Sequence, residues 1–373
     1  MSSPTNEPWT IRRIVRWSAE DFAKRGIDSP RLDAELIVAH ALGIDRVRIY
    51  MDLERELSAA ELASIRELVQ RRRKREPVAY LVGKKEFWGR SFAVSAAVLV
   101  PRPDTETLVE RALTILAGAE GGSEPGAASN DTVGARTGVD AVVTQAEWRA
   151  GLETHVEPEP EPRGELAPEG EGDRDAAAPD ARTASAPSAP HAEPGETRVL
   201  DLCTGTGAIG LTIACEVPWA RVTITDLSAP ALEIARKNLA AFSASDPTLA
   251  ARVEVREGDL YAALPAGERF ELVVCNPPYL AEAELAECEP DVRDHEPALA
   301  LVSGPRGDEA IVRVIDGARR ALEPGGRLLV EIGATQGPRV RGLFERAGFR
   351  DVRVHRDLGD RDRVVEGRWA PAP

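Results

Sequence analysis

Residues 276–279 read Asn-Pro-Pro-Tyr and directly follow the apolar run "FELVVC". An amide nitrogen is a poor nucleophile because its lone pair is delocalised. Two hydrogen-bond acceptors aimed at its two N–H bonds would hold it in place and favour the charge that develops as it attacks. Asn276 offers a side-chain carbonyl, and Pro277 offers a backbone carbonyl whose direction Pro278 restricts. The motif therefore predicts chemistry at an amide or aromatic amine nitrogen.

Tyr279 completes this motif and adds an aromatic ring beside the two acceptors. Its ring can stack on a planar acceptor group and can face a sulfonium cation. The alternative is a turn that only ends a strand, since proline cannot donate to a sheet ladder. Such a turn does not explain why an amide and an aromatic ring flank the prolines. We interpret Asn276, Pro277 and Tyr279 as catalytic and residues 276–279 together as substrate-binding.

A glycine-rich segment, "DLCTGTGAIG", supplies a second candidate site at residues 201–210. Gly205 and Gly207 let a backbone approach a ligand closely between a strand and a helix. NAD, FAD and S-adenosylmethionine sites all use such a turn. A phosphate-cradling G-x-G-x-x-G would begin at Cys203, so the segment favours a nucleoside–amino-acid ligand over a pyrophosphate. The candidate cofactor-binding residues here are Cys203, Thr204, Gly205, Thr206 and Gly207.

Two acidic residues end the next two predicted strands, "VTITD" and "VEVREGD". A carboxylate at the position of Asp226 can accept both ribose hydroxyl hydrogens of a bound nucleoside. Helix capping is the alternative, but Ser228 is better placed to cap the following helix. Asp259 or its backbone could meet an adenine edge, with Leu260 packing beside the ring, and a simple turn remains the alternative for both.

The order of these segments predicts the fold that must position them. Short β-rich runs alternate with helical runs such as "PALEIARKNLAAF" and "DEAIVRVIDGARRAL" from Arg198 onward. This alternation is typical of an α/β fold with a doubly wound, mainly parallel sheet, which binds ligands at the carboxyl ends of its strands. The polar residues that end strands are therefore the candidate site.

The amino-terminal part predicts a small helical domain over residues 1–83. Pro30 follows Ser29 at the start of one helix, and Ser58 with Glu61 forms a capping box that opens another. We interpret the basic stretch at 71–75 as a solvated helix end, favoured by the helix dipole. Residues 84–117 then predict a hairpin around Gly89 and a connecting helix capped by Asp104 or Thr105.

Residues 118–196 differ in composition from the rest of the chain, which separates them from a catalytic domain at 197–373. They hold 17 acidic and 5 basic residues, whereas the whole 373-residue chain has a net charge of −15. Their sparse apolar content predicts a disordered insertion. We expect that deleting residues 120–194 leaves a folded, active protein. The acidic total also argues against a protein that coats nucleic acid.

Four cysteines, Cys203, Cys215, Cys275 and Cys288, form no C-x-x-C pair. This usage indicates reduced thiols, with neither a disulfide framework nor a metal site. We find no apolar run of signal-peptide or membrane-spanning length, so we expect a cytoplasmic protein with no membrane partner.

Together these segments resemble the HemK/PrmC family, which methylates the glutamine of the Gly-Gly-Gln motif in peptide chain release factors. The resemblance covers nearly the whole chain outside the insertion. The matching segments are "SPRLDAELIVAHAL", "RRRKREPVAYLVGKKEFWG", "LVPRPDTETLVERAL", "VLDLCTGTGAIGL", "VVCNPPY", "DVRDHEPALAL", "EIGATQG" and "RDLGDRDRVVEGR".

The resemblance implies a helical domain that helps to recognise the release factor, joined to a class I methyltransferase domain. It implies S-adenosylmethionine bound by residues 203–207, by Asp226 and by residues around Leu260, with Asn276 also bordering the cofactor. Residues 276–279 would present the glutamine amide, and we assign Arg102 and Glu106 to substrate contact. We expect class 1 release factors as the protein partner, no stable nucleic-acid binding and a monomer.

Two departures from the family pattern accompany this resemblance. Cys203 stands where the family usually has glycine, and we expect it to be tolerated because cysteine is small. The acidic insertion falls in an ordinary connector. Alternative functions are a glutamine methyltransferase that acts on a ribosomal protein, a DNA amino-methyltransferase acting on a flipped base, a binding module without catalysis, and a nicotinamide-dependent oxidoreductase.

Overall fold

A seven-stranded sheet forms the centre of the protein in a computed structural model that describes residues 8–118 and 196–370. Its strands are β3 (Thr197–Leu202), β4 (Ala220–Asp226), β5 (Val253–Glu257), β6 (Phe270–Cys275), β9 (Leu322–Glu331), β10 (Phe349–Arg356) and β11 (Asp362–Trp369). The strand order is β10-β11-β9-β6-β3-β4-β5. The five strands from β5 to β9 in this order are parallel, and β11 pairs antiparallel with both β9 and β10. The predicted α/β, mainly parallel class is confirmed.

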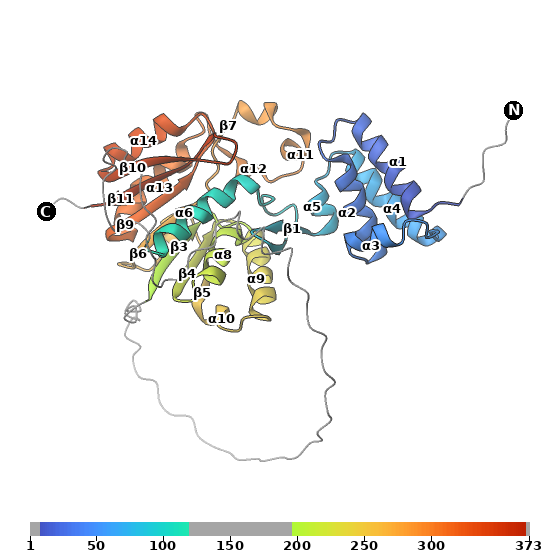
Figure 1. Cartoon of the computed structure of the whole chain (residues 1–373). Coiled ribbons are helices and arrows are strands. Elements are labelled where there is room, and N and C mark those ends of the chain that lie inside the picture. The colour runs from blue at the N-terminus through green and yellow to red at the C-terminus, as the bar shows by residue number, and fades with distance from the viewer. Residues whose placement is uncertain (1–7, 119–195, 371–373) are drawn as a thin grey trace, which may run out of the picture.

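Helices cover both faces of this sheet (Figure 1). One face packs on α6 (Glu106–Leu116), α8 (Ala208–Glu216), α9 (Ala229–Ser243) and α10 (Leu249–Arg252); the other packs on α13 (Glu309–Ala321) and α14 (Gly337–Arg346). Strand residues alternate between the two cores: Val199 joins the first, while Leu200 and Leu202 join the second. Burial on both faces explains the nearly continuous apolar runs in the parallel strands.

Five helices form a separate bundle at the amino-terminal end, with its own apolar core around Phe22, Ile37 and Ile65. They are α1 (Ile11–Lys24), α2 (Pro30–Leu42), α3 (Arg46–Met51), α4 (Ala59–Arg73) and α5 (Val78–Val82). The capping box that opens α4 is present, because Ser58 and Glu61 exchange side-chain and backbone hydrogen bonds. Ser29 precedes Pro30 as predicted, but its side chain makes no capping bond.

The hairpin predicted around Gly89 joins β1 (Lys84–Phe87) to β2 (Arg90–Ala93). A short 3-10 turn, η1 (Pro103–Thr105), then leads into α6. Neither Asp104 nor Thr105 caps this helix through its side chain, so that prediction is wrong. Asp104 instead forms ion pairs with Arg361 at 3.1 Å and with Arg363 at 3.0 Å. A carboxylate beside two guanidinium groups is better compensated than one that accepts a single backbone N–H.

The end of α4 joins the helical bundle to the sheet domain. Arg72 is 5% exposed and pairs with Asp33 at 2.7 Å and Asp291 at 2.6 Å. Arg75 also reaches Asp291, at 2.5 Å. Asp291 belongs to α11 (Pro290–Arg293), which lies between the bundle and the sheet domain in Figure 1. The interpretation of residues 71–75 as a solvated helix end is therefore wrong for Arg72 and Arg75.

Several short elements connect β5, β6 and α13: η2 (Leu260–Ala263), β7 (Leu280–Ala281), η3 (Glu284–Glu287), α12 (Ala298–Leu301) and β8 (Val302–Gly304). Within the described residues, none of the helices has the length and apolar character needed to cross a membrane. Of the insertion predicted at residues 118–196, residues 119–195 lie outside the residues that the structure describes, so the expected disorder and the expected effect of its deletion stay predictions.

Candidate active site

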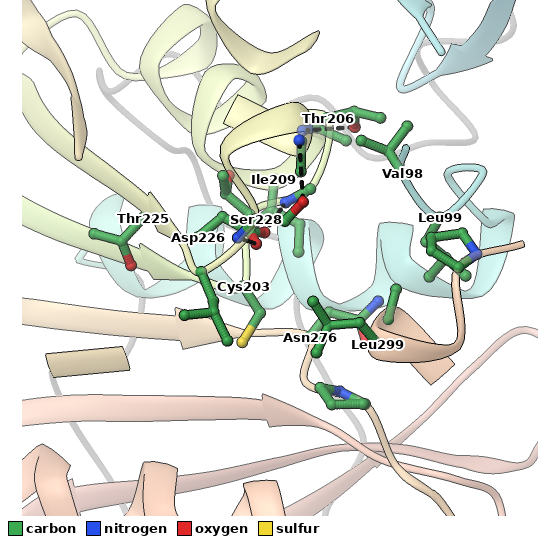
Figure 2. Close-up of a pocket in the computed structure, with 18 of the residues that line it drawn as sticks. Val98, Leu99, Cys203, Thr206, Ile209, Thr225, Asp226, Ser228, Asn276 and Leu299 are labelled. Carbon is green, nitrogen blue, oxygen red and sulfur yellow. Dashed lines mark hydrogen bonds between the residues drawn. The ribbon is translucent and has the colours of Figure 1, made fainter. Parts of the chain in front are cut away.

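A cavity opens at the carboxyl ends of β3, β4, β5 and β6, at the edge where the sequence predicted a ligand site. In Figure 2, Asp226 and Cys203 lie on one side of it, Leu99 lies on the other, and Asn276 and Leu299 lie along its lower edge in this view. Of the predicted site residues, those in its wall are Arg102, Cys203, Thr204, Gly205, Thr206, Asp226, Asp259, Leu260, Asn276 and Pro278. Residues from both sides of the insertion therefore meet in one cavity.

The β3–α8 turn is built by an unusual run of backbone angles. Cys203, Gly205 and Gly207 have φ values of 57°, 55° and 81°. This left-handed region suits glycine and strains other residues. A Cβ on Gly207 would lie 2.8 Å from Leu211 Cδ1, so a side chain there would force Leu211 to shift. Gly207 itself is absent from the residues described as lining the cavity and acts by shaping the turn.

Asp201 lies fully buried beneath this turn and stabilises it by accepting two hydrogen bonds. One carboxylate oxygen accepts hydrogen bonds from the Thr204 hydroxyl at 2.6 Å and the Gly210 amide at 2.9 Å. Burial raises the pKa of Asp201 to about 7, although these two donors partly oppose the shift. A Cβ on Gly210 would lie 2.4 Å from Ile224, so strand and helix approach closely here.

Asp226 ends β4 with its carboxylate fixed by main-chain donors. The Gly205 amide donates to one oxygen and the Ser228 amide to the other, both at 2.9 Å. Burial raises the pKa of Asp226 above its usual range, while the same backbone amides oppose the shift. Ser228 caps α9 by accepting from the Ala231 amide at 3.3 Å, as the sequence predicted. Asp226 is thus left to face the cavity.

Asp259 and Leu260 follow β5 and reach the same cavity wall. The Asp259 carboxylate forms an ion pair with Arg313 at 2.6 Å. Leu260 has a φ of 51° and packs part of its side chain against the core beneath α13. Because the carboxylate of Asp259 is occupied by Arg313, the backbone of this turn is the freer hydrogen-bonding group.

Asn276 directly follows β6 and lines the cavity, close to Thr105 and Glu331. Its Nδ2 lies 3.4 Å from the Thr105 hydroxyl oxygen, to which it donates. Glu331 ends the neighbouring strand, where Val330 pairs with Cys275. It is 1% exposed, and burial raises its pKa to about 7 while the Thr105 hydroxyl and the Asn276 amide donate to it and oppose the shift.

Besides Gly207, three predicted residues lie outside the described wall of this cavity: Pro277, Tyr279 and Glu106. The Tyr279 ring packs against the core that includes Val330, and burial raises its pKa to about 12. Its backbone oxygen accepts from Gln336 at 2.9 Å, which ties the motif to the start of α14. Glu106 accepts from the Trp88 amide at 3.0 Å and so supports the hairpin.

Arg102 enters the wall from the segment before η1 and pairs with Glu296. Glu296 is 6% exposed, and burial raises its pKa despite that pairing. Its other oxygen accepts from the Val100 amide at 3.3 Å. The carboxylate therefore positions the strand-like segment that carries Arg102 over the cavity.

Two family models and several relatives match this chain. The PrmC N-terminal domain model matches residues 13–83, and the Methyltransferase small domain model matches residues 189–288. A release factor glutamine methyltransferase from Geobacter sulfurreducens is 32% identical over 97% of this chain and 98% of its own. One from Cereibacter sphaeroides is 35% identical over 96% of this chain and 98% of its own. The chain belongs to the release factor glutamine methyltransferase family.

A solved methyltransferase from Pyrococcus furiosus is also similar, at 16% identity over 48% of this chain and 77% of its own, with a TM-score of 0.35. For this release factor glutamine methyltransferase family member, the match to the Methyltransferase small domain and the curated relatives confirm the predicted enzyme class and the predicted methyltransferase fold. The backbone at Cys203 has the conformation that glycine adopts most easily, in keeping with the glycine usual there in the family.

Sequence reasoning missed several residues at the site of this family member. Leu227 and Leu299, which are 53% and 57% exposed, add apolar surface to the wall, and Arg313 pairs with Asp259. Isolated apolar residues in loops carry no sequence signal. Glu331 did carry one, since it is an acid that ends the apolar strand "LLVE", and the strand-end rule that selected Asp226 applies equally to it.

Proposed function

We propose that this chain transfers a methyl group from S-adenosylmethionine to the N5 amide nitrogen of the glutamine in the Gly-Gly-Gln motif of class 1 peptide chain release factors. The single observation that carries this proposal is the position of Asn276, whose amide faces the same cavity as the β3–α8 turn and Asp226. The group that we propose holds the acceptor amide and the groups that we propose bind the nucleoside therefore line the same cavity.

The residues of the cavity fit S-adenosylmethionine. Asp226 presents a carboxylate that its backbone donors orient, as a ribose diol requires. The Thr225 hydroxyl oxygen is buried in the wall without a hydrogen-bond partner. Gly205 leaves open space where a Cβ would stand, since nothing lies within 4 Å of that position. Leu227, Leu260 and Leu299 offer apolar surface for an adenine ring. When bound, the cofactor supplies the methyl group as a sulfonium.

The chain's own contribution is to hold the acceptor nitrogen. The Asn276 Oδ1 and the Pro277 backbone oxygen accept the two N–H bonds of the glutamine amide, which fixes the nitrogen and favours the positive charge that develops on it. With S-adenosylmethionine bound, transfer would form an N–C bond at this nitrogen as the sulfonium C–S bond breaks, and the nitrogen would then lose one proton to water. No general base is needed, because the methylated amide is far more acidic in that charged form than the free amide.

The test is methyl transfer from labelled S-adenosylmethionine to four acceptors: purified release factor, its Gly-Gly-Gln→Gly-Gly-Ala version, a ribosomal-protein mixture and duplex DNA. We expect label on the first acceptor alone. Label on the alanine version at the same rate contradicts glutamine as the acceptor residue. Label on ribosomal protein instead of release factor contradicts the substrate while leaving the amide chemistry in place. Label on DNA contradicts glutamine as the acceptor and indicates an aromatic amine nitrogen instead.

A further inference from the structure

Glu331 is a buried acid that the proposed reaction does not yet use. It ends β9 directly beside Asn276, because Cys275 and Val330 are register partners in the parallel pair of β6 and β9. It is 1% exposed, and its Oε2 has no hydrogen-bond partner. A buried carboxyl with an unmatched oxygen destabilises a fold, so its presence at a strand end beside the acceptor-holding amide calls for a functional explanation.

The contacts around Asn276 select one of its two amide orientations. Nδ2 donates to the Thr105 hydroxyl at 3.4 Å, and the Asn276 and Thr105 side chains lie close enough to Glu331 to act as hydrogen-bond donors that oppose the rise in its pKa. An ionised carboxylate only accepts hydrogen bonds, whereas an amide has one accepting and one donating end of nearly the same shape. The acceptors therefore hold the Nδ2 end, and Oδ1 is left for the substrate.

We propose that the Glu331 carboxylate, acting with the Thr105 hydroxyl, is a positioning group that keeps the Asn276 carbonyl turned toward the acceptor nitrogen. This inference rests on the proposed function. In the opposite orientation Nδ2 would face the glutamine N–H, so two donors would meet and the acceptor would be lost. Glu331 and Thr105 touch neither substrate nor cofactor in this role and act through Asn276.

The charge on Glu331 makes this device depend on pH. Burial raises its pKa to about 7, Arg363 on β11 lowers it, and Asp104 on η1 raises it. Tyr279, the other titratable group that senses Glu331, stays neutral because burial raises its own pKa to about 12. Once protonated, Glu331 can donate to Asn276 Oδ1 and stabilise the wrong orientation. Methyl transfer should therefore fall as the pH drops below about 7.

Three variants of the full-length chain test this proposal: Glu331→Gln, Thr105→Val and the matched control Thr105→Ser. Gln keeps the size of the side chain but can donate a hydrogen bond at every pH, and Val removes the hydroxyl that Ser retains. At about pH 8 we expect kcat to fall about 100-fold for Glu331→Gln and for Thr105→Val, with Thr105→Ser near wild type. The Kd for S-adenosylmethionine should be unchanged in all three.

The pH profile separates positioning from a structural role. Wild-type kcat/KM should fall about tenfold for each pH unit below about 7, and the Glu331→Gln profile should be flat in that range. A Glu331→Gln variant with wild-type rate and profile overturns the inference. So does one whose rate loss is matched by weaker cofactor binding or a lower melting temperature, because that pattern indicates a structural role.

A measurement without turnover keeps the inference separate from the proposed function. In the full chain with ¹⁵N-labelled asparagine, the Asn276 side-chain resonance, identified by its loss in Asn276→Ala, should shift with a midpoint near pH 7. The shift should be absent in Glu331→Gln. A resonance that does not titrate in the wild type overturns the inference even if methyl transfer is normal. Titration in a chain that modifies no release factor contradicts only the proposed function.

Discussion

Different kinds of contact hold the two ends of the cavity, which are the proposed cofactor end at residues 203–207 and Asp226 and the proposed acceptor end at Asn276. At the cofactor end, residues 203–207 form one turn, and backbone amides at positions 205 and 228 fix the Asp226 carboxylate. At the acceptor end, Asn276 is held by the side chains of Thr105 and Glu331, and the first of these lies 171 residues away in the chain. One end is built from nearby main chain, and the other from distant side chains.

This difference predicts which substitutions each end tolerates. Main-chain contacts survive changes of side chain, so the cofactor end should respond mainly to an added Cβ or to loss of the Asp226 charge. Side-chain contacts depend on the chemical identity of each group, so the acceptor end should respond strongly even to substitutions of the same shape. Substitutions at the acceptor end should lower kcat, whereas substitutions at the cofactor end should weaken cofactor binding.

The largest effect is expected for Asn276→Ala. Removing the carbonyl acceptor should lower kcat by about 100- to 1,000-fold, the range found when one preorganised hydrogen-bonding group is removed from an active site. The Kd for S-adenosylmethionine, measured by calorimetry, should change little, because the cofactor end is intact. Turnover comparable to wild type would remove Asn276 from the proposed mechanism.

Asp226→Asn should produce the opposite pattern. Its amide would turn an N–H toward either Gly205 or Ser228, whose backbone amides now donate to the carboxylate, and the charge facing the ribose would be lost. Hydrogen bonds to charged groups are worth about 1.5–3 kcal/mol, so the Kd should rise about 10- to 100-fold. At saturating cofactor, kcat should stay near wild type.

The control for this variant is Asp246→Asn, which changes a partly exposed aspartate just after α9 that accepts a hydrogen bond from the Thr248 hydroxyl. Its Kd should match wild type. A fall in kcat at saturating cofactor for Asp226→Asn would contradict the division between the two ends.

Gly207→Ala should mainly reduce stability. The new methyl group would lie 2.8 Å from Leu211 Cδ1 at a φ of 81°, and the left-handed conformation alone disfavours alanine by about 1–2 kcal/mol. For a chain of this size that corresponds to a melting temperature lower by about 2–8 °C. The matched variant is Gly205→Ala, which has a φ of 55° but nothing within 4 Å, and it should lose less stability. Equal losses would mean that the contact with Leu211 is unimportant.

The smallest effect is expected for Cys203→Gly. The substitution relieves a left-handed φ of 57°, which disfavours cysteine by about 1–2 kcal/mol. Greater freedom of glycine in the unfolded chain offsets about 0.5–1 kcal/mol of that gain. We expect a free energy of unfolding higher by about 1 kcal/mol or less and slightly tighter cofactor binding. A clear loss of stability would show that the Cys203 side chain contributes to packing.

The same contrast explains what the sequence predicted and what it did not. The cofactor end could be predicted because its residues lie within one strand–turn–helix unit, and Asp226 follows from the rule for strand ends. The fold class followed from alternating strands and helices. The partners of Asn276 could not be predicted, because Thr105 precedes the insertion and no local pattern links it to β6. Arg72 was misread for the same reason: its partner Asp291 is distant in the chain.

The mixed origin of the cavity wall has one more consequence. Val98, Leu99 and Thr105 come from before residue 118, and the turn at 203–207 comes from after residue 196. The two halves are also joined by the Arg111–Glu366 ion pair at 2.5 Å and by the Ala93 amide, which donates to Asn238 at 2.7 Å. A backbone cut between residues 119 and 195 would thus leave two polypeptides, neither carrying a whole active site. A complete active site would form only when the two fragments associate. The chain could therefore be divided at this point into two complementing fragments.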